Sequence, residues 1–397
     1  MKVLQINANY GFGSTGLIVK DIGDTLRKNG DESYFAYQRT NEIIQNGYQV
    51  GNNLDWKFHA LWSRILGRQG YYSTIATKKL LTYINSICPD VVHLHNLHSN
   101  FINIDILFSF LARENIPTVI TMHDCWYFTG KCFHYIDCGC DGFQYGCGHC
   151  KKKDAPPKSY LFDWSAWSLK NKKKRLSAIP RLKIIGCSDW ICREAQKSFL
   201  NGFDICRVYN GVDVDVFKPL DNDLRDKYKV NNSYLVMGMA NKWMQNDNID
   251  LIEQVLALGD LKLMIVGCTN EQITFLGKYG EDVIPVGFIK DRSELAKHYS
   301  SADVFINLTH ADTLPTVNME SICCGTPVIT YDSCGSPELI EENTGLVVKE
   351  SDKIGIINAI DYARNNKWSK CREVGTSRFD KRICYENYLD IYSLVAK

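Results

Sequence analysis

The chain has 397 residues, of which 45% are hydrophobic and 23% are charged, and its formal net charge is +1. This composition is that of a folded globular protein and excludes a disordered chain, while the length favours two domains over one. Because the net charge is close to zero, no global electrostatic field selects nucleic acid, and we expect none as a partner.

The N-terminal sequence MKVLQINANYGFG has only a short apolar run before the polar Asn7 and Asn9. A signal peptide needs a longer apolar core, and no later run approaches the length of a membrane span. We therefore expect a cytoplasmic protein whose cysteines stay reduced. In that compartment, clustered cysteines favour metal ligation over disulfide bonds.

Short apolar segments alternate with helical patterns in the first half of the chain. This alternation indicates βαβ units and a parallel sheet. A helix is expected from Leu17 to Lys28, directly after the first strand. In chain order, the expected strands are KVLQIN, SYFAYQ, DVVHLH, TVITMHD and RLKIIGCS.

A glycine-rich loop, NANYGFGSTG, follows the first strand and leads into that helix. Gly11, Gly13 and Gly16 let backbone amides approach an anionic group. Their spacing also fits the dinucleotide pattern G-x-G-x-x-G, so a dehydrogenase has to be considered. Against this hypothesis, the second strand ends at Gln38 and Arg39, without the acidic residue that a ribose requires.

The segment DWKFHALWSRILGRQGYY, residues 55–72, predicts a basic amphipathic helix. Its aromatic and aliphatic residues alternate with Lys57, Arg64 and Arg68 at helical spacing. Such a helix either lies at an anionic lipid surface, with the basic cluster of Ser168–Leu176 in support, or turns its apolar stripe toward the core. The sequence of the helix alone slightly favours the second interpretation.

The segment from His123 to Cys150 contains six cysteines and three histidines after the strand TVITMHD. Cys132, Cys140, Cys147 and Cys150 have the spacing C-x7-C-x6-C-x2-C, and the final C-x2-C is half of a usual structural zinc site. A zinc ion would order a glycine-rich insertion. The other interpretation is a set of reduced, partly buried thiols, and the rival zinc ligands are Cys138, His134 and His149.

A second series of strands and helices starts after the segment CRVYNGVDVDVFKPLDND, residues 206–223. The expected strands are YLVMGMA, LKLMIVG, DVIPVGF, ADVFINL, TPVITYD and GLVVKE. The fold class is therefore α/β, with two Rossmann-like, doubly wound parallel sheets facing an interdomain cleft. We expect domains over residues 1–205, with an insertion at 125–150, and 206–378, followed by a helix at 379–397 that returns to the first domain.

The stretch ADVFINLTHADTLPTVNMESICC predicts a ligand site at the end of a strand. Asp312 lies in the loop, and Pro315 suits the first turn of a helix that carries Glu320. Backbone N–H groups from Thr313 to Val317 offer a site for a diphosphate. The segment CGSPE repeats this arrangement with Glu338. Alternatively, Asp312 and Glu338 merely favour helix N-termini.

These residues carry a resemblance to a known family. The pattern Asp312-x7-Glu320 with CCGTPVITYDSCGSPE resembles the Glu-x7-Glu motif of retaining glycosyltransferases of family 4, which have the GT-B fold. NGVDVDVFKP resembles the interdomain signature of that family, and GFGSTG, TMHD and FDKRICYENYLDIY lie where the family has its glycine loop, His-Asp pair and final helices. The similarity covers nearly the whole chain. HDCWYFTGKC and GCGHC resemble a subgroup that assembles bacterial surface polysaccharides.

The resemblance implies roles for particular residues. Glu320 would hold the donor ribose, Asp312 would hold the donor sugar, and His123 would lie beside the anomeric centre of the donor. The other residues implied to bind the donor are Gly13, Lys242, Lys290, Thr313, Leu314, Thr316 and Val317, and those implied on the acceptor side are Gly11, Ser14, Thr15 and Asp124.

The implied reaction transfers a glycosyl unit from a UDP- or GDP-sugar, with retention, to a saccharide or a polyprenyl-diphosphate-linked acceptor. Helix N-termini and cations would stabilise the leaving diphosphate, so neither a divalent ion nor a catalytic cofactor is expected. A lipid-linked acceptor would place the protein on the inner face of the cell membrane. Asp213 and Asp215 have a metal-binding spacing, but a structural role is expected for them.

Two positions depart from the family pattern. Asp312 stands where the family has Glu, which shortens the side chain by one methylene. Asn246 and Asp247 stand where the family usually has an Arg and a Lys on the donor diphosphate, so Lys242 or Lys290 would substitute. This departure keeps open a catalytically weak protein of the same fold that binds a glycan and serves as a partner. An NAD-dependent oxidoreductase is a third hypothesis.

Overall fold

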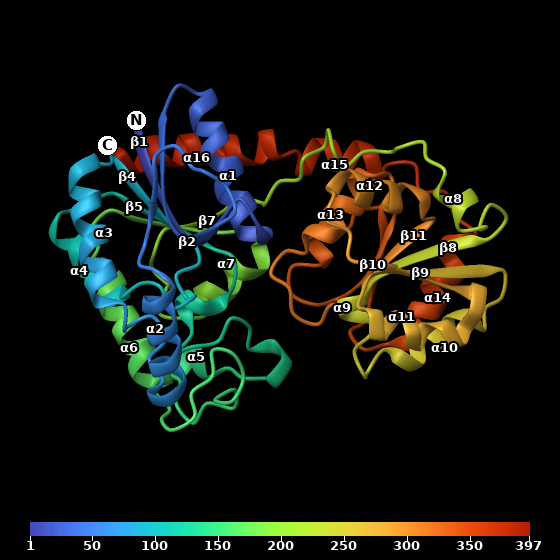
Figure 1. The fold of residues 1–397 in the computed structure, drawn as a ribbon, viewed down its shortest axis with the longest axis horizontal. Coiled ribbons are helices and arrows are strands. Elements are labelled where there is room, and N and C mark those ends of the chain that lie inside the picture. Colours follow the sequence, from blue (N-terminus) through green and yellow to red (C-terminus); the bar gives the residue numbers. More distant parts are fainter. The chain divides into compact units, whose positions relative to one another are not determined.

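A computed structural model describes residues 1–397, and the chain divides into two compact units. The first unit comprises Met1–Tyr209 and Tyr385–Lys397, and the second comprises Asn210–Cys384. Each unit contains one parallel sheet with flanking helices (Figure 1). The fold class predicted from the alternation of strands and helices, two doubly wound α/β units, is confirmed.

The sheet of the first unit has the strand order β3-β2-β1-β4-β5-β6-β7, with every neighbouring pair parallel. The chain moves outward from β1 to β3 and then returns to the other side of β1 with β4. Doubly wound sheets bind ligands at the carboxyl edge of such a switch point. The strands are β1 (Lys2–Tyr10), β2 (Glu32–Thr40), β3 (Gly47–Gln49), β4 (Val91–Leu94), β5 (Thr118–Met122), β6 (Leu182–Gly186) and β7 (Ile205–Arg207).

Helices lie between these strands, and none of them has the length and apolar composition needed to cross a membrane. The helix after β1 begins at Gly13, which is earlier than the expected start at Leu17. The elements are α1 (Gly13–Lys28), α2 (Asn53–Leu66), α3 (Thr74–Ile87), α4 (Ile104–Arg113), η1 (Cys125–Phe128), η2 (Ile136–Cys138), α5 (Gly142–Tyr145), α6 (Ser165–Leu176), α7 (Asp189–Gln196) and the end of α16 (Lys381–Ala396).

Helix α2 buries the apolar stripe of its sequence only in part, since Trp56, Trp62, Ile65 and Leu66 are half-buried. Leu54, Phe58 and Leu61 are 75%, 56% and 54% exposed. The interpretation in which this stripe faces the core is therefore wrong for Phe58 and Leu61, because smaller and more polar side chains occupy the inner face. The residues of α2 that are buried are His59, Ala60 and Ser63.

The sheet of the second unit has the order β10-β9-β8-β11-β12-β13 and is also parallel throughout. Its switch point lies between β8 and β11. The strands are β8 (Tyr234–Met239), β9 (Leu261–Cys268), β10 (Val283–Gly287), β11 (Val304–Asn307), β12 (Val328–Tyr331) and β13 (Gly345–Val348). The helices are α8 (Leu224–Lys227), α9 (Ala240–Trp243), α10 (Ile249–Leu256), α11 (Asn270–Leu276), η3 (Gly277–Asp282), α12 (Arg292–Ser301), α13 (Thr316–Cys323), η4 (Pro337–Leu339), α14 (Lys353–Arg364) and α15 (Cys371–Phe379).

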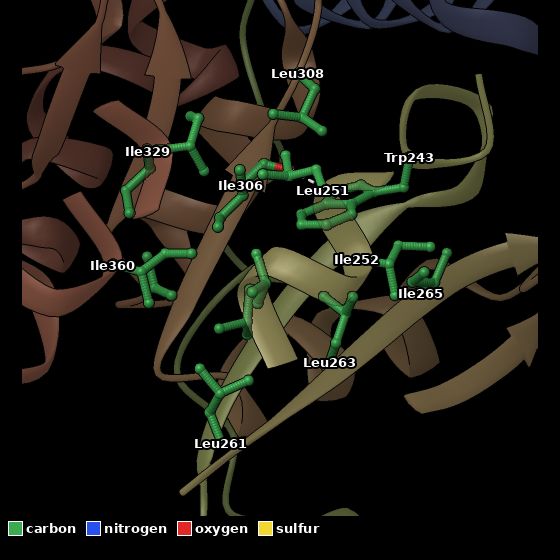
Figure 2. Packing of buried hydrophobic residues seen from close by; sticks show 14 of the residues in the cluster. Trp243, Leu251, Ile252, Leu261, Leu263, Ile265, Ile306, Leu308, Ile329 and Ile360 are labelled. Atoms are coloured by element: carbon green, nitrogen blue, oxygen red, sulfur yellow. Dashed lines mark hydrogen bonds between the residues drawn. The ribbon is translucent and has the colours of Figure 1, made fainter. Parts of the chain in front are cut away.

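An apolar cluster joins the second sheet to α9, α10 and α14, and Figure 2 shows its labelled members Trp243, Leu251, Ile306 and others. The Trp243 indole N–H donates to the Ile306 carbonyl at 3.3 Å. The ring passes so close to Gly238 that a Cβ there would lie 1.9 Å from the indole nitrogen. Only glycine fits this approach, which fixes the turn that carries Lys242.

Candidate functional site

A cavity of about 360 Å³ lies at the switch point of the second sheet. It is bordered by the carboxyl ends of β8, β9 and β11, as expected for a doubly wound sheet. Three of the residues implied to bind the donor, Lys242, Asp312 and Val317, line this cavity. Residues that the sequence did not single out also line it, among them Asn241, Gly267, Phe288, Ile289 and Asn307.

Two hydrogen bonds of Asp312 hold the loop before α13. The Asp312 carboxylate accepts from the Leu314 N–H at 3.1 Å, and the Asp312 carbonyl accepts from the Gly335 N–H at 3.2 Å. The second contact ties this loop to the segment CGSPE. Helix α13 begins at Thr316, and Pro315 before it provides no side-chain cap. Its first backbone N–H groups are therefore available to an anion.

Three buried hydroxyls near these loops have no hydrogen-bond partner: Thr309 Oγ1, Thr313 Oγ1 and Ser336 Oγ. A buried hydroxyl without a partner is unfavourable, and a ligand rich in oxygen atoms would satisfy it. Thr313 was among the residues implied by the resemblance. Thr309 was not among them, although its position shortly after the end of β11 could have indicated that it lies at this edge of the sheet.

Glu320 lies on α13 with its carboxylate between two partners. The Tyr299 hydroxyl donates to Oε2 at 3.4 Å, and Arg292 Nη2 lies 3.6 Å from Oε1. Burial raises the pKa of Glu320 to about 7, while Arg292 opposes this shift. The guanidinium of Arg292 also lies 4.9 Å from the centre of the Phe217 ring. No pattern in the sequence indicated a role for Arg292, because its contact with Glu320 joins residues of two different helices.

The two cations considered as substitutes for the missing Arg-Lys pair differ in position. Lys242 lines the cavity, whereas Lys290 is exposed and only its neighbours Phe288 and Ile289 line it. Asn246 and Asp247 are exposed and do not line the cavity. Lys242 is therefore the only cation in the lining.

The glycine loop of the first unit has the backbone that its sequence predicts. Gly11 and Gly13 have φ values of +74° and +66°, which favour glycine. The Gly11 N–H donates to the Gly16 carbonyl at 3.1 Å. Ser14 and Thr15 lie in the first turn of α1, which has no side-chain cap and no acidic residue.

His123 follows β5 and ends a hydrogen-bond chain that fixes the position of its proton. Gln5 Nε2 donates to the Val19 carbonyl at 3.1 Å, so Gln5 Oε1 is the acceptor for His95 Nε2–H at 3.2 Å. His95 Nδ1 then accepts from His123 Nε2–H at 3.0 Å. His123 Nδ1 keeps its lone pair, and this buried atom has no partner. It is an acceptor for a ligand hydroxyl.

The two histidines of this hydrogen-bond chain, His95 and His123, are neutral near pH 7. Burial lowers the pKa of His123 to about 4, although Asp124 acts in the opposite direction. Burial also lowers the pKa of His95 and of its neighbour His93. The assignment above gives each ring one N–H donor and one acceptor nitrogen, and only a neutral imidazole has both.

Asp124 is a structural neighbour of His123. Its Oδ1 accepts from the Trp126 N–H at 2.9 Å, and its Oδ2 lies 2.8 Å from His98 Nε2. Burial alone would raise the pKa of Asp124, but His98 and the Trp126 N–H hold it below its usual value. The carboxylate therefore stays ionised and orders the turn η1.

Asp213 and Asp215 are occupied by ion pairs, as the structural interpretation predicts. Asp213 Oδ2 lies 2.9 Å from Lys381 Nζ, and Asp215 Oδ2 lies 3.1 Å from Arg382 Nη1. Both pairs connect the segment after residue 210 to the start of α16.

The cysteine-rich segment carries free thiols. A hydrogen bond from Cys132 lowers the pKa of the Cys150 thiol, so these two side chains are in contact. No group of three or more Cys, His, Asp or Glu side chains has an arrangement that could hold a metal ion. The zinc site formed by Cys132, Cys140, Cys147 and Cys150 stays a prediction.

Two Rossmann-like parallel-sheet units with polar loops at their carboxyl edges define the GT-B class of glycosyltransferases. Residues 16–216 match the family described as Glycosyltransferase Family 4, and residues 221–377 match Glycosyl transferases group 1. The chain belongs to Glycosyltransferase Family 4. This membership leaves the NAD-dependent oxidoreductase hypothesis without support.

Similar proteins extend over the same length. WcaC of Escherichia coli, assigned as a colanic acid biosynthesis glycosyl transferase, is 22% identical over 387 residues, which are 90% of this chain and 89% of WcaC. A sucrose-phosphate synthase from Thermosynechococcus elongatus has a TM-score of 0.69 at 16% identity, covering 99% of this chain and 98% of that one. HepE from Anabaena, in complex with UDP and glucose, has a TM-score of 0.64 at 17% identity, covering 99% of each chain. At these identities the two structures show the fold alone.

Proposed function

We propose that this glycosyltransferase transfers a sugar, with retention, from a nucleotide-sugar donor to a saccharide or lipid-linked saccharide during assembly of a bacterial surface polysaccharide. The role assigned to the Escherichia coli relative supports the pathway. The UDP and glucose bound to the Anabaena protein support the donor class. The observation that carries the proposal is the cavity lined by Lys242, Asp312 and Val317 at the second switch point.

The proposal assigns the parts of the donor by chemistry. Phe288 and Ile289 supply an apolar wall for the base, and the carboxylate of Glu320 accepts hydrogen bonds from the ribose hydroxyls. Lys242 and the first N–H groups of α13 face the diphosphate. The unpaired hydroxyls of Thr309 and Thr313 provide further hydrogen bonds.

In the transfer step, the bond between the anomeric carbon and the donor diphosphate breaks while the acceptor oxygen bonds to the same face. The transition state resembles an oxocarbenium ion, and the departing diphosphate takes the negative charge. Lys242 and the α13 N-terminus stabilise that charge without a divalent ion. The acceptor proton leaves with the released nucleoside diphosphate, and His123 Nδ1 accepts a hydrogen bond from a substrate hydroxyl.

Ligand protection followed by a transfer assay tests the proposal. At 100 times its dissociation constant, UDP or GDP should stabilise the protein by about 2.7 kcal/mol, which raises the melting temperature by several degrees. Mass spectrometry should then detect one added sugar on a saccharide acceptor for one nucleotide sugar of the protecting base. Protection by neither nucleotide would contradict the assignment of the cavity.

The alternative is a protein of the same fold that binds a glycan but transfers sugar weakly. Asn246 and Asp247 favour it, since each missing charge-assisted hydrogen bond removes about 1.5–3 kcal/mol of donor binding. Lys242 in the cavity lining favours the enzyme. Binding of a saccharide without nucleotide protection or transfer would identify the alternative.

We also propose that the protein works at a membrane surface. The support is the outward apolar face of α2, with Leu54, Phe58 and Leu61 exposed beside the exposed cation Lys57. A helix with this pattern is suited to lie in the interface of an anionic bilayer.

A further inference from the structure

A second cavity, of about 620 Å³, lies in the first unit and takes no part in the proposed donor site. It is at the carboxyl edge of the first sheet, beside the switch point. Asn9 at the end of β1, Gln38 and Arg39 at the end of β2, His98 after β4 and Phe133 after β5 line it. The remaining wall comes from α2 and from Gln69, Ser99, Asn100, Pro156, Pro157, Lys158 and Tyr160.

Three cations border this cavity without any acidic residue in its lining: Arg39, Arg64 and Lys158. None of the three has a carboxylate partner. The guanidinium of Arg39 lies 4.5 Å from the centre of the Trp56 ring, and the Trp56 indole N–H donates to the Ser99 carbonyl at 3.0 Å. Like charges that converge without a counterion repel one another, so a bound anion would be stabilised here.

An exposed apolar surface adjoins these cations. Tyr160, Leu161 and Phe162 are exposed, as are Leu54, Phe58 and Leu61 of α2. The two segments adjoin at the C-terminal end of α2, where the Tyr160 N–H donates to the Arg64 carbonyl at 2.7 Å and the Leu161 N–H donates to the Ile65 carbonyl at 3.3 Å. An apolar patch of this kind marks a contact with another apolar surface.

We propose that this cavity binds the diphosphate of a lipid-linked acceptor, with the lipid chain lying on the adjoining apolar surface. This inference rests on the proposed function and names the chemical class of its acceptor. A compact anion matches Arg39, Arg64 and Lys158, and an alkyl chain covers Leu61 and Tyr160. A soluble sugar phosphate would use the cations and leave the apolar surface uncovered.

The position of His98 connects this cavity to the predicted site residues. His98 lines the cavity, and its Nε2 lies 2.8 Å from Asp124 Oδ2, directly beside His123 in the chain. An acceptor whose diphosphate meets the cations therefore has its saccharide within the part of the first unit that carries His123. Gln69 Oε1, which is buried without a partner in the same lining, is an acceptor for a saccharide hydroxyl.

Direct binding of small probes tests the proposal without a known acceptor. The titrations use farnesyl diphosphate below its aggregation concentration, inorganic diphosphate and farnesol, each with the full-length Lys242→Gln protein. That background weakens diphosphate binding at the donor cavity, and the variants of the first unit described below identify the binding that remains there. We expect farnesyl diphosphate to bind at least tenfold more tightly than inorganic diphosphate, and farnesol to bind weakest.

Matched variants separate the two parts of the surface. Arg64→Gln with Lys158→Gln should weaken both diphosphate probes at least tenfold, whereas Phe58→Ser with Leu61→Ser should weaken only farnesyl diphosphate. The control, Lys78→Gln with Lys79→Gln, removes exposed lysines of α3 that do not line the cavity and should change nothing.

Two outcomes would overturn the inference. Unchanged farnesyl diphosphate binding in the Arg64→Gln/Lys158→Gln variant would show that the cavity is not the anion site. Equal affinity for farnesyl and inorganic diphosphate would identify a soluble phosphate as the ligand. Nucleotide protection of the parent protein is measured separately, so a failure here is distinguishable from a failure of the donor site.

Discussion

Glu320 gives the donor site a pH dependence that can be measured. Its pKa of about 7 lies above the usual value of 4.5 because burial disfavours the carboxylate. We expect nucleoside diphosphate affinity to rise as pH increases through 7, since the ionised carboxylate accepts ribose hydroxyls more strongly. Arg292 favours the ionised form, and the Tyr299 hydroxyl donates to it.

The phosphates of the ligand titrate in the same pH range as Glu320. The variant Glu320→Gln removes the titration of the carboxyl group and leaves that of the phosphates, so the comparison isolates the effect of Glu320. Its affinity should show only the dependence of the phosphates, and its transfer rate should fall by about 10- to 150-fold, the equivalent of 1.5–3 kcal/mol. The folded state binds a proton that the unfolded state has lost between pH 4.5 and 7, so this carboxyl lowers stability as pH rises over that range. Unchanged kinetics with an intact fold would remove Glu320 from the site.

His123 should affect transfer more than donor binding, since it lies in the first unit and the donor cavity lies in the second. His123→Ala should therefore lower the transfer rate while nucleoside diphosphate affinity stays within about twofold. The measurement compares single-turnover transfer with calorimetric titration. Equal losses in both would mean that His123 supports donor binding or the fold.

Gln5 is a positioning residue for His123, because its carbonyl oxygen selects the tautomer of His95. In Gln5→Met, the tautomer of His95 is no longer selected by this acceptor, so part of the population should carry the His123 proton on Nδ1. Long-range nitrogen-15 NMR spectra report the tautomer directly, which a purely structural effect would not change. Transfer should fall in Gln5→Met, and adding His123→Ala should cause little further loss.

At the scale of elements, the exposed apolar residues of α2 lead us to expect reversible membrane binding. The protein should float with anionic liposomes at low salt and dissociate at high salt, because each cation near the surface contributes about 1 kcal/mol and salt screens it. Phe58→Ser with Leu61→Ser should reduce flotation, since burial of each side chain contributes about 1.5–3 kcal/mol. The Lys78→Gln/Lys79→Gln protein is the control. A parent protein that stays unbound at low salt would contradict membrane binding.

From the spacing of Cys132, Cys140, Cys147 and Cys150 in the insertion between β5 and α6, we expect about one structural zinc per chain. Cys147, Gly148 and His149 all have positive φ values in the C-x2-C turn, and Lys172 lies buried nearby. Burial lowers the pKa of Lys172 to about 7, while Cys147 and Cys132 raise it. Four thiolates on zinc would add negative charge and favour the charged lysine, whose Nζ donates to the Trp126 carbonyl at 2.6 Å.

Elemental analysis of protein purified without a metal-affinity tag measures this zinc. Cys147→Ser should lower the zinc content and loosen the insertion, which would reduce transfer indirectly. Cys88→Ser, at an exposed cysteine outside the insertion, is the control. Protein without zinc, with all four thiols freely reactive in the folded state, would show the insertion to be a set of reduced cysteines.

At the scale of the whole molecule, transfer should not require a free divalent ion. Asp213 and Asp215, which have a metal-binding spacing, are engaged in ion pairs, and Lys242 faces the diphosphate in the proposal. A mild chelator should therefore leave the transfer rate within about twofold. A large loss that magnesium restores, while zinc content is unchanged, would contradict this mechanism.

The sequence by itself determined the class of fold and one edge of the site. Apolar strands of a parallel sheet and amphipathic helices have local patterns, so the alternation along the chain predicted two doubly wound sheets. Because ligands bind at the carboxyl ends of such strands, the loop with Asp312 could be assigned to a ligand site, and the family resemblance added Lys242 or Lys290 as a cation for the donor. The turn with Gly11 and Gly13 was predictable for the same local reason.

Only the tertiary structure decided the contacts between distant residues. Gln5, His95 and His123 meet because β1, β4 and β5 are neighbours in a particular register, which no local pattern specifies. Arg292 on α12 contacts Glu320 on α13 because these two helices pack together, which no local pattern specifies either. The outward apolar face of α2 was also not predictable, because an amphipathic pattern defines a stripe but not its direction. Which side of a helix becomes buried depends on the surfaces that pack against it, and these come from remote parts of the chain.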